Sequence, residues 1–157
     1  MAAWVGAIVG EHVAAAWPAG SLVALSTAGS TPYYAPQHRY IDMLGLNDRH
    51  IAKRNIEQIQ LPLQEVPGHL KGDGAYVLSR VPDFIILGPA EGTTTADPWF
   101  LSDLELARDS RFLRDYRVCQ VRLDGRGAVI PRGRVVFTYY QRIAPVPAGT
   151  RREAMPL

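Results

Sequence analysis

Residues 26–51, STAGSTPYYAPQHRYIDMLGLNDRHI, decide the fold because they join two predicted strands through one turn-rich segment. The apolar run SLVALS at residues 21–26 lies between turn signals, as expected of a buried central strand. Residues 39–44, RYIDML, predict a second strand. A glycine, hydroxyl residues and Pro32 between them predict a turn and then one short helical turn over residues 32–35. Two strands with a helical connection favour parallel pairing.

Further helices and strands are predicted on both sides of this stretch. Helical patterns cover residues 2–17, 49–56, 75–80 and 99–114, the last with a break near residues 109–110. Strand patterns cover residues 83–88, 116–123 and 134–143, with hairpin turns towards the end of the chain. The expected fold class is α/β: a layered, mixed sheet with parallel early strands and an antiparallel hairpin edge at the C-terminal end. We expect a single domain over residues 1–144 and a disordered tail over residues 145–157.

The composition is that of an ordinary globular protein. Of 157 residues, 47% are hydrophobic and 20% are charged, and the net charge is +2. The basic residues form no stripe, so nucleic acid is not an expected partner. The single cysteine, Cys119, excludes an internal disulfide and is expected to be a small buried side chain. No apolar run approaches the roughly 18 residues of a membrane span. Glu11 and His12 interrupt the apolar start, which argues against a signal peptide.

The turn after the first strand supplies the first candidate ligand-binding residues. Gly29 belongs to the run TAGST, whose backbone N–H groups and hydroxyls follow the carboxyl end of a predicted strand, where open α/β sheets bind ligands. The adjacent Tyr33 and Tyr34 are suited to stacking on a sugar ring or another apolar ligand face. The alternatives are a simple tight turn, and a pair with one ring in the core and one at its rim. The fingerprint GxGxxG is absent, so no dinucleotide is predicted.

Acidic, basic and histidine side chains gather in and after the second strand. The candidate ligand-binding residues there are Asp42, Asp48, His50, His69, Lys71 and Asp73. Their spacing matches no standard zinc or calcium motif, so we predict no metal and no cofactor. The alternative roles are helix capping, by Asn47 or Asp48, and hydrogen bonding. A buried Asp42 would need a partner, for which the candidates are Arg39, Arg49 and Lys71.

Glycines flank the segment that carries His69, Lys71 and Asp73. They would let its backbone approach a ligand, as in a mobile loop over a pocket, and a solvated surface loop is the alternative. His12 and His38 are expected at the surface. The chain has no serine elbow, suggests no Cys–His pairing and shows no visible glycosidase-type carboxylate pair. The sequence therefore predicts where a site lies but no catalytic residue.

Three motifs carry a resemblance to a known class of proteins. They are TAG with the tyrosine pair, D-x-L-G-L-x-D-x-H-I from residue 42, and R-x-P-D-x-I from residue 80. Over residues 3–143 the chain resembles the C-terminal soluble portion of bacterial GT-C-type membrane glycosyltransferases, the polyprenyl-phosphate-sugar-dependent mannosyl- and arabinosyltransferase-like proteins. The resemblance implies an extracytoplasmic domain, periplasmic or at the cell surface, attached to a membrane half. That half carries the acidic catalytic residue.

The resemblance leads us to expect a non-catalytic accessory domain of a membrane glycosyltransferase. It would bind or position a glycan or polyprenyl-linked sugar and contact the membrane half of the same protein. Two alternatives stay open: a purely structural domain that packs on its membrane half, and a small metal-assisted hydrolase that uses Asp42, Asp48, His50 and His69. The ligand-contact expectation depends on one hollow shared by the strand exits and the histidine loop, with Tyr34, Asp42 and His69 on the same side.

Overall fold

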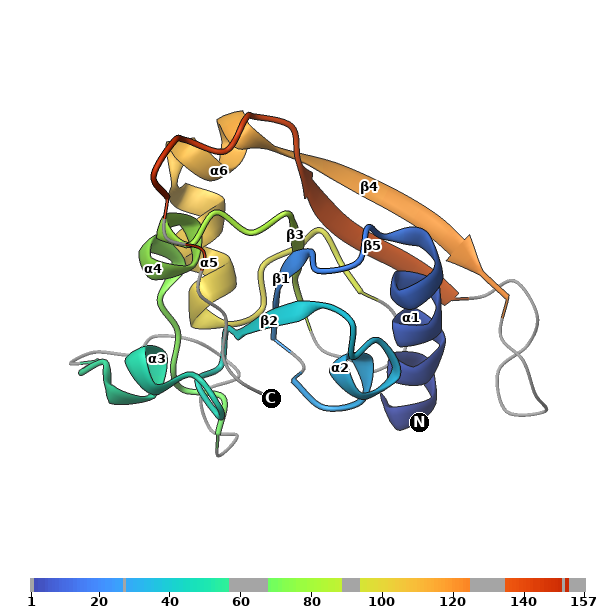
Figure 1. The fold of residues 1–157 in the computed structure, drawn as a ribbon. Helices are drawn as coiled ribbons and strands as arrows, with labels where there is room; N and C mark the ends of the chain where they lie inside the picture. Colours follow the sequence, from blue (N-terminus) through green and yellow to red (C-terminus); the bar gives the residue numbers. More distant parts are fainter. Residues whose placement is uncertain are drawn as a thin grey trace.

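The computed structural model describes residues 2–26, 28–56, 68–88, 94–124, 135–150 and 152, with side chains from residue 5 onward. Within these residues, five strands form one sheet in the order β2-β1-β3-β5-β4 (Figure 1). The strands are β1 (Leu22–Leu25), β2 (Arg39–Asp42), β3 (Phe84–Ile86), β4 (Tyr116–Leu123) and β5 (Val135–Arg142). β1 pairs in parallel with β2 and β3, whereas β5 is antiparallel to both β3 and β4. The predicted α/β class with a mixed sheet is confirmed.

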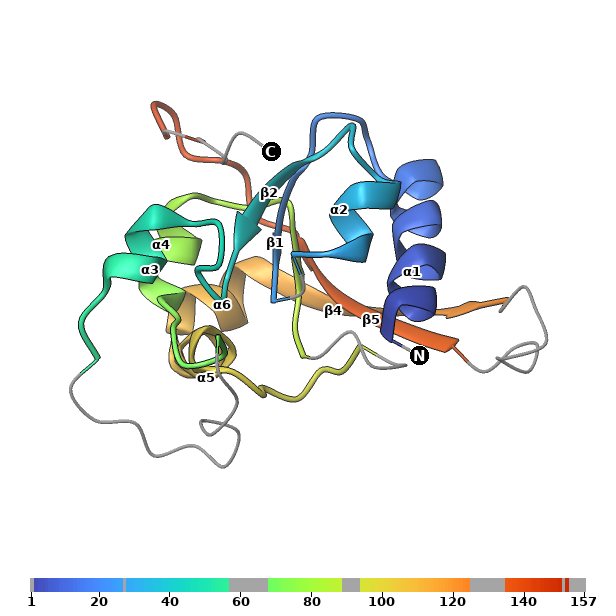
Figure 2. The same ribbon diagram turned by 90° about the horizontal axis from the view of Figure 1, so that it is seen from below.

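Helices cover both faces of the parallel strands (Figure 2). One face, called the α1 face, carries α1 (Ala2–Ala16) and α2 (Ser30–Tyr34). The opposite face, called the α5 face, carries α3 (Arg49–Lys53), α4 (Gly74–Ser79), α5 (Leu101–Arg108) and α6 (Ser110–Asp115). The chain passes from β1 to β2 through α2 and from β2 to β3 through α3 and α4. The parallel strands are therefore covered from two sides by successive crossovers.

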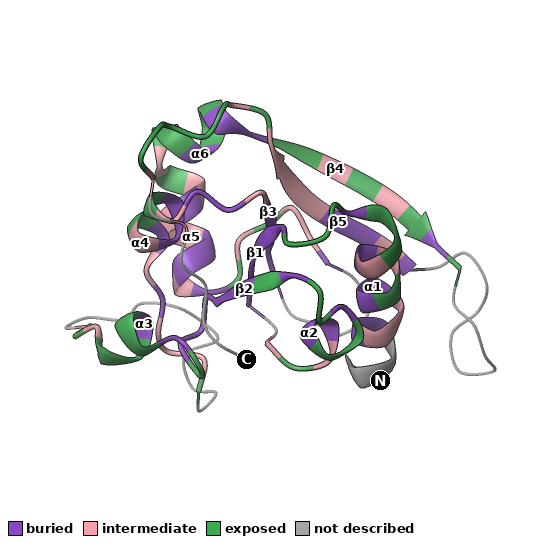
Figure 3. Cartoon of the chain, in the orientation of Figure 1, coloured by how far each residue is buried: buried purple, intermediate pink, exposed green. Residues whose placement is uncertain are grey.

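β1 is the centre of the parallel half and is buried along its whole length (Figure 3). Val23 and Leu25 belong to the core of the α1 face, whereas Leu22 and Ala24 belong to the core of the α5 face. Because successive strand residues point to opposite faces, a strand covered on both sides must be apolar at every position. This explains the uninterrupted apolar run in the sequence.

The core of the α1 face is built on one helix stripe and an aromatic stack. Val5, Val9 and Val13 recur every fourth residue along α1 and are buried. Trp17 follows them and stacks on Phe84, with ring centroids 3.8 Å apart and planes 7° apart. This stack joins the end of α1 to β3.

α2 packs tightly on α1. A Cβ added to Gly10 would lie 2.9 Å from the Thr31 carbonyl oxygen and 2.7 Å from the Tyr34 Cβ, so only glycine allows this approach. The helical turn begins at Ser30 and not at Pro32, so the predicted start was two residues late. Pro32 is buried against its neighbours, inside the short helix.

Two predictions of burial were wrong. His38, expected at the surface, is buried, and its Nε2 lies 3.3 Å from the Val13 carbonyl oxygen. This burial lowers the pKa of His38. Cys119, expected in the core, is half-buried because β4 is the outer strand and pairs with β5 only.

Some predicted features lie outside the described residues: the start of the TAGST turn at Thr27, the segment 57–67, the turn after Asp124 and the hairpin at residues 131–133. The disordered tail expected over residues 145–157 stays a prediction, and its residues 151 and 153–157 lie outside the described ones. Residue 152 is described, and the Arg39 guanidinium donates to its carbonyl oxygen at 2.8 Å. In the part of the chain that the structure covers, no helix has the length and hydropathy to cross a bilayer.

Candidate functional site

A hollow with basic residues around it lies beside α3. It has a volume of about 570 Å³ and is open to solvent. Four of its five lining residues come from the α3 segment and one from the loop before α4: Arg49, His50, Lys53, Arg54 and Asp73. We call this cavity the α3 hollow. It brings together two of the predicted residues, His50 and Asp73, which are 23 positions apart in the chain.

Asp48 is the N-cap of α3, which confirms helix capping as one of its predicted roles. Its Oδ1 accepts hydrogen bonds from the backbone N–H groups of His50 at 2.9 Å and Ile51 at 3.1 Å. The Tyr76 hydroxyl donates to its Oδ2 at 3.3 Å. The Asp48 carboxylate is therefore engaged as an N-cap and as a tie between α3 and α4. Ile51 anchors the helix in the core below.

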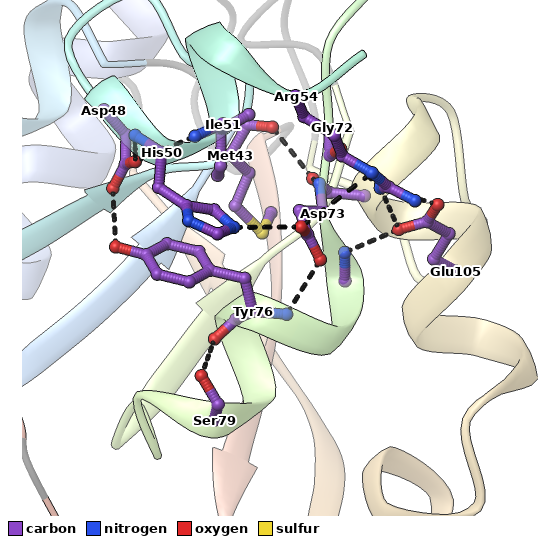
Figure 4. Close-up of polar contacts among 12 residues, drawn as sticks. Met43, Asp48, His50, Ile51, Arg54, Gly72, Asp73, Tyr76, Ser79 and Glu105 are labelled. Carbon is purple, nitrogen blue, oxygen red and sulfur yellow. Dashed lines mark hydrogen bonds and ion pairs between the residues drawn. The ribbon is translucent and has the colours of Figure 1, made fainter. Parts of the chain in front are cut away.

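Asp73 caps α4 in the same way and also lines the hollow, and Figure 4 shows its carboxylate between His50 and Arg54. Its Oδ1 accepts from the Tyr76 N–H at 2.9 Å. Its Oδ2 lies 3.1 Å from His50 Nε2 and 3.8 Å from Arg54 Nε. The His50 ring stacks on the Tyr76 ring, with centroids 4.0 Å apart and planes 13° apart. Burial, followed by the neighbouring Asp48 charge, raises the pKa of the Tyr76 hydroxyl.

Arg54 is held by a carboxylate from α5. Its Nη1 donates to Glu105 at 2.8 Å and to the Gly72 carbonyl oxygen at 2.6 Å. The hydrogen bond with Glu105 raises the pKa of Arg54. Glu105 also accepts from the Gly74 N–H at 2.7 Å. Lys71, a predicted ligand residue, donates from Nζ to the Arg54 carbonyl oxygen at 2.6 Å. This contact joins the segment before α4 to the end of α3.

Arg49 and Lys53 differ from these engaged charges. They lie four positions apart on α3, on the same side of the helix, and both are exposed. Among the described residues, neither has an ion-pair or hydrogen-bond partner for its side chain. With Arg54 balanced by Glu105 and Asp73, these two cations make the rim of the hollow positive. An anion is the ligand that such a rim attracts.

Asp42 does not contact the hollow. Its side chain is fully buried, and its two oxygens accept from the backbone N–H groups of Leu44 at 3.0 Å and Asn47 at 2.7 Å. The prediction that a basic side chain would pair with it was wrong, because the tight turn after β2 supplies two backbone donors instead. Asp42 therefore shapes the turn that leads into α3.

The other predicted residues lie apart from the α3 hollow. Tyr33 and Tyr34 are on α2, on the opposite face of the sheet, and are 77% and 42% exposed. The alternative with one ring in the core was wrong, since the two rings meet edge to face at 5.1 Å outside it. Gly29 precedes α2 and is exposed, and a Cβ there would meet no atom within 4 Å. His69 lies against Phe100, with ring centroids 5.4 Å apart. Neither hollow that the described residues line contains Tyr34, Asp42 or His69, so the expected shared hollow is not among them.

Sequence reasoning gave no site role to several residues that matter here. Lys53, Arg54, Tyr76 and Glu105 contribute to the α3 hollow or its support. A local signal existed for the first, because Arg49 and Lys53 have the spacing of a helix face. No local signal pointed to Glu105, which comes from a helix 51 positions beyond Arg54.

Asp103 is a further buried carboxylate that the sequence did not single out. It accepts from Gly88 N, Trp99 N and Phe100 N at 3.1–3.2 Å and from the Ser26 hydroxyl at 3.2 Å. Burial raises the pKa of Asp103, against the lowering effect of these four donors. The contacts tie the carboxyl ends of β1 and β3 to the start of α5, so Asp103 has a structural role.

The comparisons with known proteins give a family and no activity. Within the described residues, no group of three or more His, Cys, Asp or Glu side chains could hold a metal ion, so the metal-assisted alternative gains no support there. Searches of curated proteins and of solved structures return no match. The resemblance to membrane glycosyltransferases is not tested and stays a prediction. One family model matches residues 1–140, and the chain therefore belongs to the family described as a domain of unknown function, DUF8728.

Proposed function

We propose that this chain is a non-catalytic, extracytoplasmic accessory domain that binds an anionic glycan or a lipid-linked sugar phosphate in the α3 hollow. The glycosyltransferase parent, its membrane half as a partner and the extracytoplasmic location rest on the resemblance described above. The binding mode rests on the geometry of the hollow, and it can be tested on the isolated chain.

The observation that carries the proposal is the pair of unengaged cations at the rim. Arg49 and Lys53 are exposed and lack partners among the described residues, while nearby Arg54 is already balanced by Glu105 and Asp73. A phosphate or carboxylate at the rim would therefore gain two charge-assisted contacts without displacing an existing pair.

The lining beside these cations suits the sugar part of such a ligand. The His50 side chain is 53% exposed and its ring rests on Tyr76, which holds the imidazole in one orientation. The free face of the ring offers a flat surface for a sugar. Asp73 Oδ2, at the edge of the same surface, is an acceptor for a sugar hydroxyl. Three features thus favour an anionic sugar: a flat ring, an acceptor and a positive rim.

The carboxylates around the hollow favour binding over chemistry. Asp48 and Asp73 cap helices, and Glu105 is shared between Arg54 and the Gly74 N–H. Each of these groups would have to give up a structural contact to act as a general base or a nucleophile. We therefore assign no catalytic role to these three carboxylates.

Calorimetric titration of the purified chain tests the proposal. The ligands are a polyprenyl-phosphate sugar in detergent, the matching soluble sugar phosphate and the neutral sugar. We expect the two phosphate-bearing ligands to bind, with affinity that falls as salt rises, and the neutral sugar to bind at least about tenfold more weakly. The double variant R49Q/K53Q should lose most of this affinity.

A matched control separates the site from the overall charge. Arg117 and Arg122 are exposed on β4, far along the sheet from α3, so R117Q/R122Q removes the same charge elsewhere. The proposal fails if neither phosphate ligand binds, or if both double variants lose affinity equally. Turnover of the polyprenyl-phosphate sugar by the isolated chain would contradict the non-catalytic assignment.

One observation favours the structural alternative, a domain that packs on its own membrane half. Neither of the two hollows described here is lined by Gly29, Tyr33 or His69, and the two tyrosine rings of α2 are exposed on the α1 face. Exposed aromatic rings are typical of contact surfaces. Co-purification with the membrane part of the same protein, lost in Y33S/Y34S and kept in R49Q/K53Q, would support this alternative.

A further inference from the structure

A second hollow lies at the other end of the parallel strands. It has a volume of about 440 Å³ and shares no lining residue with the α3 hollow. Its walls are the turn between α1 and β1 at residues 18–21, the start of β3 with Phe84, the end of β5 with Arg142, and Val146 and Arg152 from the C-terminal segment. We call it the tail hollow.

Arg142 has a largely enclosed side chain that lies over the Tyr116 ring, with its Cζ 5.5 Å from the ring centroid, and its charge is only partly balanced. Its side chain is 9% exposed, and the nearest carboxylate oxygen, Asp115 Oδ2, lies 3.7 Å away. Asp115 already accepts two shorter bonds, of 2.6 and 3.0 Å, from Arg114. The Arg142 guanidinium donates at 3.0 Å to the Pro145 carbonyl oxygen and at 3.4 Å to the Tyr116 hydroxyl, and its Nε is buried without a partner. A buried charge of this kind is costly unless an anion completes its contacts.

The second arginine in the lining has its own carboxylate. Arg152 Nη2 forms an ion pair with Asp83 Oδ2 at 2.5 Å, although Arg152 Nε and Nη2 are buried without a hydrogen-bond partner, and the Arg152 carbonyl oxygen accepts from Arg39. Asp83 is in turn fixed to the sheet, because its Oδ2 also accepts from the Leu22 N–H at 2.8 Å. The Asp83 charge is therefore committed to Arg152 and does not offset Arg142. The C-terminal segment forms one wall of the hollow through these contacts.

We infer that the tail hollow binds a small organic oxyanion, a carboxylate or phosphate group on an apolar body, with Arg142 as its anchor. The planar guanidinium suits a two-oxygen group of either kind. Phe84, Val146 and the Pro18 ring supply an apolar wall for the body of the ligand. An oxyanion that contacts the guanidinium would compete with the Pro145 carbonyl oxygen for Nη2, so binding should change the environment of Pro145 and its neighbours.

An amide-shift NMR titration of the full chain tests this inference with four probes: benzoate, phenyl phosphate, inorganic phosphate and neutral benzyl alcohol. We expect saturable shifts of the Ser21, Phe84 and Gln141 amides with the two aromatic anions. Inorganic phosphate should bind more weakly and benzyl alcohol should not bind. A preference between benzoate and phenyl phosphate identifies which oxyanion the hollow prefers.

Variants distinguish the role of Arg142, which anchors the oxyanion, from that of Arg152 in the wall of the hollow. R142Q should abolish binding, and R142K, which keeps the charge but loses the fork, should weaken it at least about fivefold. If R142Q does not fold, R142K and R152Q carry the test, and R152Q should also weaken binding because Asp83 is left without its cation. K53Q should leave binding unchanged, which keeps this site separate from the α3 hollow. Absence of saturable shifts at the three amides, or unchanged affinity in R142K, would overturn the inference.

Discussion

Both faces of the sheet have an apolar core, but the helices that cover them are held in place in different ways. On the α1 face, one long helix covers the strands with apolar side chains and an aromatic stack of Trp17 on Phe84. On the α5 face, four helices of five to eight residues each add only a few apolar side chains, and carboxylates hold their ends. A short helix has little apolar surface to bury, so its stability depends on caps and polar ties. The α3 hollow therefore lies on the face where capping carboxylates fix the positions of the helices.

The largest expected effect lies on the α1 face. Trp17 is 8% exposed and contacts Phe84, Phe137 and Tyr139 through ring contacts. W17A should lower the free energy of unfolding by about 4 kcal/mol, because it removes a large buried ring and leaves a cavity. Urea unfolding followed by circular dichroism measures the loss. A loss below about 1 kcal/mol would mean that the apolar description of this face is wrong.

Asp103 is the equivalent test on the α5 face. D103A leaves three backbone N–H groups and the Ser26 hydroxyl without their acceptor, and should lower the free energy of unfolding by about 3 kcal/mol. D103N keeps an acceptor oxygen of the same shape and should cost less. Equal losses in the two variants would show that negative charge, and not hydrogen-bond acceptance, is what the site requires.

Asp48 tests a single cap on the same face. D48A should cost about 1–2 kcal/mol through the lost N-cap, whereas D48N, also a good cap, should cost little. The same unfolding assay ranks the two variants. D48A should also weaken ligand binding at the α3 hollow, since the cap orients the helix that carries Arg49 and Lys53. Unchanged ligand affinity in D48A would show that binding at the α3 hollow does not depend on the N-cap of α3.

The smallest effect concerns acid, and it returns to the α1 face. Burial lowers the pKa of both His12 and His38 in the folded state relative to the ordinary value of 6.5. Their stabilising contribution is therefore complete above that value and is lost as pH falls through the lowered folded pKa. The urea midpoint should fall between about pH 7.5 and about pH 5, and H38Q should fall less. If the urea midpoint of H38Q falls with pH as much as that of the unchanged protein, His38 is not the cause of the acid effect.

The sequence predicted the layers well and the site only in part. β1 was recognisable because burial on both faces requires an unbroken apolar run, and Asp48 was recognisable because an N-cap is a local feature. The two wrong predictions about polar residues have one cause. Asp42 accepts from backbone N–H groups of its own turn, and the His38 ring lies against the Val13 carbonyl oxygen, 25 positions away. The spacing of residues in the sequence predicts neither contact. The sequence also cannot predict that Arg49 and Lys53 lack ion-pair partners among the described residues. That depends on the fold, which places Glu105 and Asp73 beside Arg54 instead.

The position of β5 in the sheet has a consequence for how the chain reaches its final form. β5 pairs with β3, and Arg142 N donates to the Asp83 carbonyl oxygen at 2.9 Å, so the last of the described strands closes the open edge of the three parallel strands. During synthesis, the apolar border of β3 stays open until residues 135–142 leave the ribosome. An open apolar border of this kind invites pairing with other chains. The nascent domain is therefore most open to such pairing in the interval before β5 emerges, when most of the described core has already been made.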